Sequence, residues 1–444
     1  MSDESLLPFL SQFDPPQQAE GSLDPLGLFA VADALGVRLA PGVRERQSTP
    51  RYLTLALVGM AACGDNLKTA GDAKGLPAWL VFEWLIVESL VRQLKGTPEL
   101  QGIPGRDKVL ATLTAGDSVC MRTYLKTPSV FGFHGIYRVL GVKAGIFDTE
   151  GNPGERGFSV LSAWQADQGM QGLVSGEGPG SELRRAIERA VRHGLDAEQM
   201  RDPGASLRTL IAAHLHPRAP GPLEQAALWA ALTDNDALRG EYATWLTSAE
   251  GQVAWKDAED SEAEFHAWLA PRASLQMRQL LEAIRCFERL ARLLTDAFDE
   301  ARWRMTQERA PVDDAWLGKG DAMREANRQA LSAYRDALQE LGEVEPALRM
   351  RVERAFVWIG EATTPASFAS LLLGHHLKVQ QGKPPNGKRP WFDMFGDGRV
   401  AIRPAYTLAE FVSRAGQFVQ AYRTRPIWSF AHHLGRLAQV EELA

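Results

Sequence analysis

The chain has 444 residues, of which 45% are hydrophobic and 23% are charged, and its formal net charge is −6. This length leaves room for two or three domains, and the composition is typical of a folded globular protein. A net acidic chain is not expected to bind nucleic acid over its whole surface, so any such function must depend on local basic patches.

The sequence also excludes several classes of protein. The most apolar window, Trp79 to Val91, is too short to span a bilayer and contains Glu83 and Glu88. Residues 1–21 lack the basic and apolar stretches of a signal peptide, and they carry too little apolar surface to fold. We therefore expect a cytoplasmic protein with a disordered N-terminus and no membrane contact.

The three cysteines give no sign of a structural cross-link. Cys63, Cys120 and Cys286 are far apart in the sequence, and no histidine stands beside them at zinc-ligand spacing. We expect reduced thiols, without a disulfide framework, a metal or a cofactor.

Residues 22–174 are predicted to form a first helical domain. Helices are expected over 22–39, 52–63 and 77–94, and the last of these is apolar nearly all round, which is typical of a buried helix. The polar stretch 64–75 is expected to be a loop.

The second half of this domain has the order of a winged-helix-like unit. A helix at 107–113, a strand-like stretch at 119–125, a helix at 129–140 and a strand-turn stretch at 146–154 follow one another. In winged-helix modules the second helix of the pair enters the major groove of DNA. The predicted DNA contacts are the basic residues on that helix and before it, Arg122, Lys126, Arg138 and Lys143. Alternatively, these short helices belong to one of many folds that bind no DNA.

The glycine-rich stretch 175–180 is interpreted as a domain boundary. It lacks the preceding strand and the third glycine of a dinucleotide-binding loop. Residues 181–272 are predicted to form a middle helical domain, and four tryptophans are expected in its core: Trp229, Trp245, Trp255 and Trp268.

Residues 275–360 are predicted to form a long antiparallel helical hairpin of coiled-coil type. Apolar residues recur at steps of four and three over 280–305 and again over 331–355, on either side of a break at 311–320. Two facing seams joined by a short link favour antiparallel packing. The charged outer face fits both packing inside the chain and contact with a protein partner.

Residues 365–444 are predicted to be a basic, aromatic C-terminal segment, helical again over 407–437. Between 374 and 403, cations outnumber acids by six to two, and aromatic rings are interleaved with them. Cations that contact phosphates and rings that stack on bases suit nucleic-acid binding. The predicted contacts are Lys378, Lys383, Lys388, Arg389, Trp391, Arg399 and Arg403. Alternatively, Trp391 and the phenylalanines beside it pack into the protein body and the lysines only solvate the loop.

Several sequence patterns bear on whether the chain is an enzyme. Residues 382–388 have the glycine spacing of a P-loop but contain two prolines, and His376-x-Lys378 lacks the aspartate of a phospholipase D motif. A nuclease-like carboxylate-lysine set occurs only inside the predicted loop: Asp65, Lys68, Asp72 and Lys74. A phosphodiesterase or nuclease site near His375 and His376 stays open as an alternative function.

The stretch from Tyr124 to Trp164, YLKTPSVFGFHGIYRVLG followed by GERGFSVLSAW, resembles uncharacterised bacterial proteins of helicase-containing phage-defence gene clusters. The resemblance covers a small part of the chain and assigns no site residue. It implies a subunit of a multi-protein, DNA-directed system with a helicase or nuclease as partner. We therefore expect a mainly α, multi-domain protein that acts as a non-enzymatic DNA-binding adaptor. Alternatively, it is a scaffold that binds only protein, through the hairpin.

Overall fold

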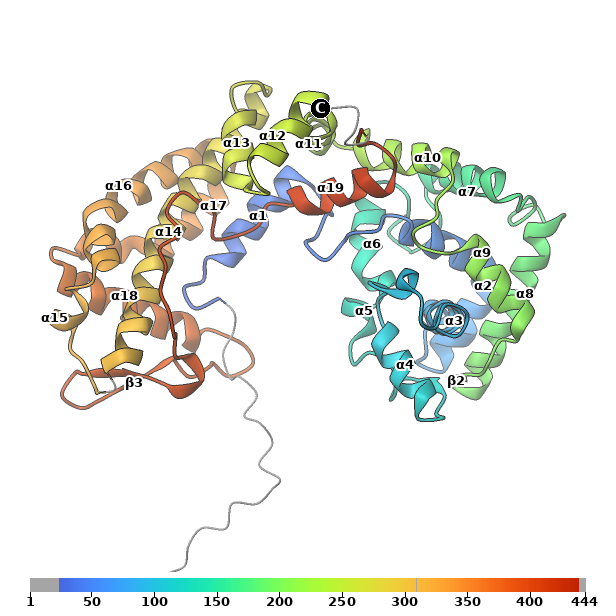
Figure 1. Ribbon diagram of the computed structural model, residues 1–444, viewed down its shortest axis with the longest axis horizontal. Helices are drawn as coiled ribbons and strands as arrows, with labels where there is room; N and C mark the ends of the chain where they lie inside the picture. Colours follow the sequence, from blue (N-terminus) through green and yellow to red (C-terminus); the bar gives the residue numbers. More distant parts are fainter. Residues whose placement is uncertain (1–23, 309, 439–444) are drawn as a thin grey trace, which may run out of the picture. The chain divides into compact units, whose positions relative to one another are not determined.

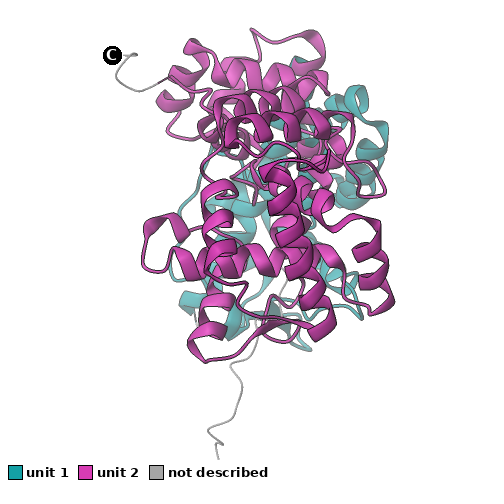
Figure 2. Ribbon diagram, turned by 90° about the vertical axis from the view of Figure 1, so that its right-hand side faces the viewer, with its two compact units in different colours: residues 1–35, 278–420 teal, residues 36–277, 421–444 magenta. Residues whose placement is uncertain are grey.

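The computed structural model describes residues 24–308 and 310–438, so the segment 1–21 that we expect to be disordered lies outside the described residues. The described chain is mainly helical, as the sequence predicts, and its strands are short (Figure 1). It divides into two compact units, which Figure 2 colours separately: unit 1 comprises residues up to 35 and 278–420, and unit 2 comprises residues 36–277 and the chain from 421 onward. None of the described helices is both long and apolar enough to cross a bilayer.

Unit 1 is helical with one small β-hairpin. Helix α1 (Phe29–Leu39) starts in unit 1 and ends in unit 2, and α14 (Leu275–Glu308) starts at the end of unit 2. The remaining elements of unit 1 are α15 (Asp314–Leu317), α16 (Asp321–Val344), α17 (Pro346–Phe356), η2 (Val357–Glu361), α18 (Pro365–Gln381), β3 (Phe392–Met394), β4 (Val400–Ile402) and η3 (Pro404–Tyr406). Strands β3 and β4 pair antiparallel, with Asp393 opposite Ala401.

The apolar seam predicted on α14 is buried along its whole length, from Leu280 to Met305. The facing side of α16 differs from the prediction. Its buried residues are mainly alanines, including Ala330 and Ala337, whereas Leu331 and Leu338 are only half-buried. Small side chains let two helix axes approach closely, so alanine fills this position better than leucine.

Helices α14 and α16 contact each other in opposite chain directions. Glu300 accepts hydrogen bonds from the amides of Asp321 and Met323 at 2.8 and 3.1 Å. Further along, Arg289 lies 3.3 Å from the carboxylate of Asp336. Residue numbers therefore fall along α14 as they rise along α16.

The second apolar stretch, predicted over 331–355, is divided between two helices. Helix α16 ends at Val344, and α17 begins at Pro346. Proline lacks an amide hydrogen and fits the first turn of a helix, so Pro346 starts a new helix instead of continuing the old one.

Unit 2 contains the other helices and a two-stranded sheet. In chain order its elements are α2 (Tyr52–Ala73), α3 (Ala78–Gln93), η1 (Pro98–Leu100), α4 (Arg106–Thr114), β1 (Val119–Cys120), α5 (Pro128–Phe131), α6 (Phe133–Lys143), α7 (Glu155–Gln168), α8 (Pro179–Ala197), β2 (Gln199–Met200), α9 (Ala205–His214), α10 (Pro222–Thr233), α11 (Ala237–Thr247), α12 (Ala249–Asp257), α13 (Glu262–Leu269) and α19 (Thr424–His433).

Helix α3 lies at the centre of unit 2. It packs against α2, α4, α6, α8 and α9, and its residues from Leu80 to Val91 are all buried. This agrees with the apolar pattern found in the sequence. Two carboxylates, Glu83 and Glu88, are buried with it, and the Glu88 carboxylate lies 2.8 Å from Arg92.

The polar stretch 64–75, predicted as a loop, is mostly helical. Helix α2 continues to Ala73 across a kink at Gly64, where φ is 55° and ψ is −179°. Leu67 and Gly71 are buried on this second part of α2, so the polar residues are its solvent-facing side. Gly71 is needed there, because a Cβ would lie 2.6 Å from the carbonyl oxygen of Leu76.

The strand pairing in unit 2 is long-range. Strand β1 pairs antiparallel with β2 and places Val119 opposite Met200, so the strand predicted over 119–125 is short and does not pair with the stretch after α6. That stretch forms only an isolated bridge between Phe147 and Pro153. Helix α8 packs on α2 and α3, and residues 36–277 form one unit although the sequence suggested a boundary at 175–180.

The stretch predicted as helix over 407–437 is helical only at α19. Residues 407–423 form no helix, and residues 407–420 run alongside α14 (Figure 1). Charged side chains of α14 hold this chain in place: Arg292 donates to the carbonyl of Phe418 at 3.0 Å, and Asp296 accepts from the Ser413 hydroxyl at 2.8 Å. These contacts replace the backbone hydrogen bonds of a helix.

A buried ion pair connects the start of α2 to α10. Arg51 is 1% exposed, and its Nε lies 3.0 Å from the carboxylate of Glu224, which is fully buried. The guanidinium also donates to the carbonyls of His214 and His216. Every charged atom of the pair therefore has partners, which is the condition under which burial of an ion pair is tolerated.

Replacing Arg51 with leucine leaves Glu224 buried without its cation. We expect the free energy of unfolding to fall by about 3–5 kcal/mol, measured by urea denaturation. Arg44, which is exposed in the same loop, provides the control, and Arg44→Leu should change stability by less than about 0.5 kcal/mol.

The double variant Arg51→Leu with Glu224→Leu distinguishes the cost of an unpaired buried charge from the cost of lost side-chain packing. Removing both charges should recover much of the stability, because no unpaired buried charge remains. Equal losses for Arg51→Leu and Arg44→Leu would contradict the importance of this pair.

Candidate functional site

The predicted cations of the C-terminal segment differ in availability. Lys378 on α18 and Lys388 in the following loop are exposed, and neither ammonium group forms an ion pair with a described residue. Arg389 lies 3.6 Å from Asp393, and Arg399 lies 2.7 Å from Asp397, in pairs that are themselves exposed. Local carboxylates therefore offset part of the positive charge that the sequence suggests.

The other two cations of this segment bind the protein's own backbone. The ammonium group of Lys383 donates to the carbonyl of Asp24, and the guanidinium of Arg403 donates to the carbonyl of Pro390 at 3.2 Å. Both side chains are half-buried. They hold the segment together more than they present charge to a ligand.

Trp391 is not available to stack on a base, in contrast to our expectation. It is 9% exposed, and its ring stacks on Tyr406 with centroids 4.8 Å apart. The guanidinium of Arg302 lies over the ring at 4.7 Å. Phe392 is buried as well, whereas Phe395 is exposed. Trp391 and Phe392 thus belong to the core of unit 1, which is the alternative that the sequence left open.

His375 and His376 connect α18 to the N-terminal residues of unit 1 by hydrogen bonds. Nε2 of His375 donates to the carbonyl of Leu26 at 2.9 Å. In His376, Nε2 accepts the amide hydrogen of Trp391 at 3.0 Å, so Nδ1 carries the proton and donates to the carbonyl of Pro25 at 2.9 Å. Burial lowers the pKa of His376 to about 4, which keeps this ring neutral. Both nitrogens of His376 are thus engaged, and the ring is fully buried, so it cannot reach a phosphodiester.

Replacing His376 with phenylalanine removes two buried hydrogen bonds and leaves the Pro25 carbonyl and the Trp391 amide without partners. Each of the two orphaned groups costs about 1–3 kcal/mol, so we expect a loss of roughly 2–6 kcal/mol in the free energy of unfolding. Exposed His432 provides the control. A loss no larger than that of His432→Phe would contradict the structural role of His376.

The segment 118–147 of unit 2 carries exposed positive charge and has no acid in its own sequence. It contains four cations and no aspartate or glutamate. All four are exposed, and none forms an ion pair with a described residue: Arg122, Lys126, Arg138 and Lys143. The structure therefore leaves all four predicted contacts of this segment open to a ligand, unlike those of the C-terminal segment.

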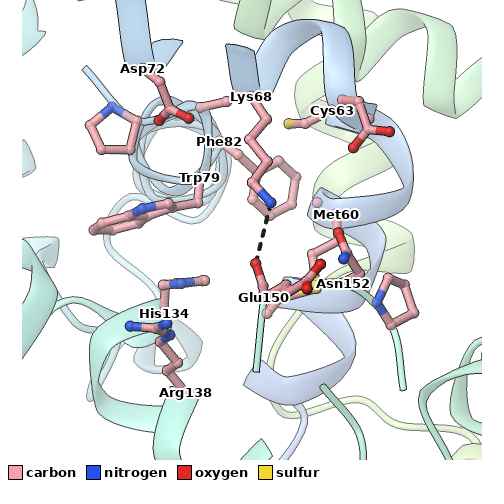
Figure 3. Close-up of a pocket in the computed structure, with 18 of the residues that line it drawn as sticks. Met60, Cys63, Lys68, Asp72, Trp79, Phe82, His134, Arg138, Glu150 and Asn152 are labelled. Carbon is pink, nitrogen blue, oxygen red and sulfur yellow. Dashed lines mark hydrogen bonds between the residues drawn. The ribbon is translucent and has the colours of Figure 1, made fainter. Parts of the chain in front are cut away.

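A cavity of about 430 Å³ opens beside α6 within unit 2 (Figure 3). Its inner walls are apolar and aromatic, and include Met60, Trp79, Phe82 and Phe133. Charged and polar side chains line the rest: Asp65, Lys68, Asp72, His134, Arg138, Glu150 and Asn152. A concave apolar pocket with a few polar groups is the usual form of a small-ligand site.

Glycines shape this cavity at two places. A Cβ at Gly59 would lie 2.6 Å from the ring of Phe82, so this glycine lets α2 and α3 approach closely. The kink at Gly64 redirects the second half of α2, and nothing lies within 4 Å of the Cβ position there. Lys68 extends from this half of α2 and donates to the carbonyl of Glu150 at 3.2 Å (Figure 3).

The carboxylate of Glu83 fixes the start of α6 behind the cavity. It accepts the Tyr124 hydroxyl at 2.8 Å and the backbone amide of His134 at 3.0 Å. A Cβ at Gly132 would lie 2.0 Å from this carboxylate, so glycine is required there. Burial raises the pKa of Glu83 to about 7, although its two hydrogen bonds act in the opposite direction.

Two potentially reactive groups of the cavity are held in their neutral forms. Burial, and next the charge of Arg138, lower the pKa of His134 to about 4. The ring of His134 also stacks on Trp79, with centroids 4.5 Å apart. Burial raises the pKa of Cys63 to about 12, so its thiol is not a nucleophile near neutral pH.

The carboxylate-lysine set noted in the sequence lies on a helix, not in a solvated loop. Asp65, Lys68 and Asp72 all line the cavity, whereas Lys74 pairs with Asp196 at 3.1 Å outside it. No cluster of three metal-ligating side chains occurs among the described residues. The cavity thus offers binding groups, and sequence reasoning missed it because its walls come from four separate stretches.

The raised pKa of Glu83 predicts a stability that depends on pH. The folded state binds this proton more tightly than the unfolded state, whose glutamate titrates near 4.5. Its stabilising contribution is therefore complete below pH 4.5 and is lost as the pH rises through about 7. Between pH 5 and 8 the protein should lose at most about 3 kcal/mol relative to Glu83→Gln.

This comparison uses urea denaturation at several pH values, with the exposed Glu150→Gln as control. The control should follow the unaltered protein at every pH. A stability difference between the unaltered protein and Glu83→Gln that does not change with pH would contradict the assignment.

Comparisons of the chain with protein-family models, with curated proteins and with solved structures find no match in any of the three. We therefore infer function from the geometry within each unit and from the sequence itself.

Proposed function

We propose that this protein is a non-enzymatic DNA-binding adaptor subunit whose main DNA contact is the segment 118–147 of unit 2. The observation that carries the proposal is the charge of this segment: four exposed cations, no acid within it, and no ion pair with a described residue. In a chain with a net charge of −6, such a segment directs a polyanion to one surface. Lys378 and Lys388 of unit 1 are a second, smaller set of contacts.

The physical basis is the release of counterions from DNA. Each phosphate neutralised by a lysine or arginine releases a condensed cation, so affinity falls as salt rises. Within the proposal, α4 and α6 are the helix pair of a winged-helix-like unit, and α6 faces the DNA. Phe131 and Val139 are exposed beside the cations, and apolar groups of this kind contact sugars and bases in a groove.

The adaptor part of the proposal concerns a protein partner, such as a helicase or nuclease subunit of a bacterial defence system. The local resemblance of residues 124–164 to proteins of such gene clusters motivates it, and the α14–α16 pair is the proposed helical hairpin. Met350 and Val357 are exposed apolar residues beyond this pair, on α17 and η2. They favour a second candidate, a scaffold that binds only protein.

The structure argues against a nuclease or phosphodiesterase site at His375 and His376. Both rings are buried, and both donate to backbone carbonyls. A catalytic histidine must reach the proton or phosphate on which it acts.

Fluorescence anisotropy with a labelled duplex tests the DNA contact. We expect the triple variant Arg122→Glu, Lys126→Glu, Lys143→Glu to bind at least about tenfold more weakly at 100 mM salt, and to show a smaller slope of log affinity against log salt by about two to three. Arg138 is left unchanged because it lines the cavity.

A second triple variant provides a control with the same change in net charge. Arg185, Arg189 and Arg201 are exposed and come from outside the basic segment. Their replacement with glutamate should weaken binding far less. Equal weakening by the two triple variants would mean that only net charge matters, and would refute the assigned surface. Absence of any salt-dependent binding would leave the protein-only scaffold.

A further inference from the structure

The cavity beside α6 combines acidic groups with Arg138, which is also one of the four cations of the proposed DNA contact. Asp65 and Asp72 belong to α2 and Arg138 to α6, and no described residue forms an ion pair or hydrogen bond with any of these three charged groups. Figure 3 shows Asp72 and Arg138 on opposite sides of the cavity, and Lys68 extends toward the carbonyl of Glu150. The cavity is thus lined by three acids, Asp65, Asp72 and Glu150, and by two cations, Lys68 and Arg138.

Its apolar part favours a flat ring. Phe82 and Phe133 are buried, whereas Trp79 is half-buried and lines the cavity. The ring of His134 lies almost parallel to Trp79, with an interplanar angle of 13°, and so fixes the orientation of the indole. Aromatic walls held in this way bind planar rings by stacking, at low cost in conformational entropy.

The volume limits the ligand to a small molecule. About 430 Å³ falls within the range of cofactor and metabolite sites, roughly 300–1,000 Å³. The ligand therefore needs a planar ring, an anionic group and hydrogen-bond donors, all within one small molecule. A nucleoside monophosphate combines these three features.

We infer that the cavity binds a nucleoside monophosphate, with its phosphate at Arg138, its base against Trp79, and its amino or hydroxyl donors toward Asp65 and Asp72. Lys68 has three ammonium hydrogens and uses one for the Glu150 carbonyl, so it supplies a second contact for the phosphate. This inference goes beyond the proposed DNA contact and does not depend on it. The nucleotide is either a free molecule or an unpaired nucleotide at the end of a strand.

Isothermal titration calorimetry with the full chain tests the inference. The probes are dAMP, dCMP, dGMP, dTMP and inorganic phosphate. At least one nucleotide should bind more tightly than phosphate, because the ring adds apolar contacts that phosphate lacks.

Two arginines of the basic segment make a matched pair of variants. Arg138 lines the cavity, and Arg122 does not. Both are exposed, so neither replacement is expected to disturb folding. Arg138→Met should weaken nucleotide binding by about tenfold or more, and Arg122→Met should leave it within about twofold.

Filling the cavity gives an independent test. Met60 is half-buried on its apolar wall, and Met60→Trp should abolish nucleotide binding. Thermal unfolding of each variant shows that it is folded before it is titrated. Should Met60→Trp fail to fold, the pair Arg138→Met and Arg122→Met still decides the question.

The source of the nucleotide is settled with two duplexes, one blunt and one with a single unpaired 5′-phosphorylated nucleotide. Tighter binding of the second duplex, lost in Met60→Trp, assigns the site to a strand end. Equal binding of both duplexes, with nucleotides still bound, assigns it to free nucleotides.

Three results would overturn the inference: no binding of any nucleotide at millimolar concentration, phosphate binding as tightly as the nucleotides, or equal effects of Arg138→Met and Arg122→Met. Failure to bind either duplex bears only on the proposed DNA contact, so the two proposals can fail separately.

Discussion

One buried carboxylate, that of Glu83, holds the start of α6, a helix that contributes to both candidate sites of unit 2. It comes from α3, the central helix, and binds the Tyr124 hydroxyl and the first turn of α6. An anion at the start of a helix is favoured by the helix dipole and by the unpaired amides there. The same contact holds α6, which carries Arg138 and Lys143 of the basic segment and His134 of the cavity wall. The cost of burying Glu83 is visible in its raised pKa.

The distribution of charge is the reason why we propose the main DNA contact in the segment 118–147 and not in the C-terminal segment. In both regions the sequence has an excess of cations. Around β3 and β4, however, acids stand two to four residues away and pair with the arginines, as Asp397 does with Arg399. The segment 118–147 has no such acids. A cation therefore stays available where the chain lacks a local acid, and counting charges over a window misses this difference.

The parts that the sequence predicts well are governed by local periodicity. The buried helix α3 and the seam of α14 follow from apolar spacing alone. The helical stretch 65–73 was not predicted because its buried face has few large side chains. The break at Pro346 was not predicted because the apolar spacing continues past it. The burial of Trp391 and the pairing of Arg51 with Glu224 depend on contacts over long sequence distances. The cavity depends on such contacts too, because its walls come from four separate stretches of the chain.

We propose that the acid-free segment 118–147 of unit 2 is the main contact with the nucleic acid. Hydrogen–deuterium exchange of the full chain, with and without saturating duplex DNA, tests it without any substitution. We predict slower exchange in peptides from 118–147, with little change in α14 or around β3 and β4. Slower exchange confined to residues 378–403, or no change anywhere in 118–147, would contradict the account.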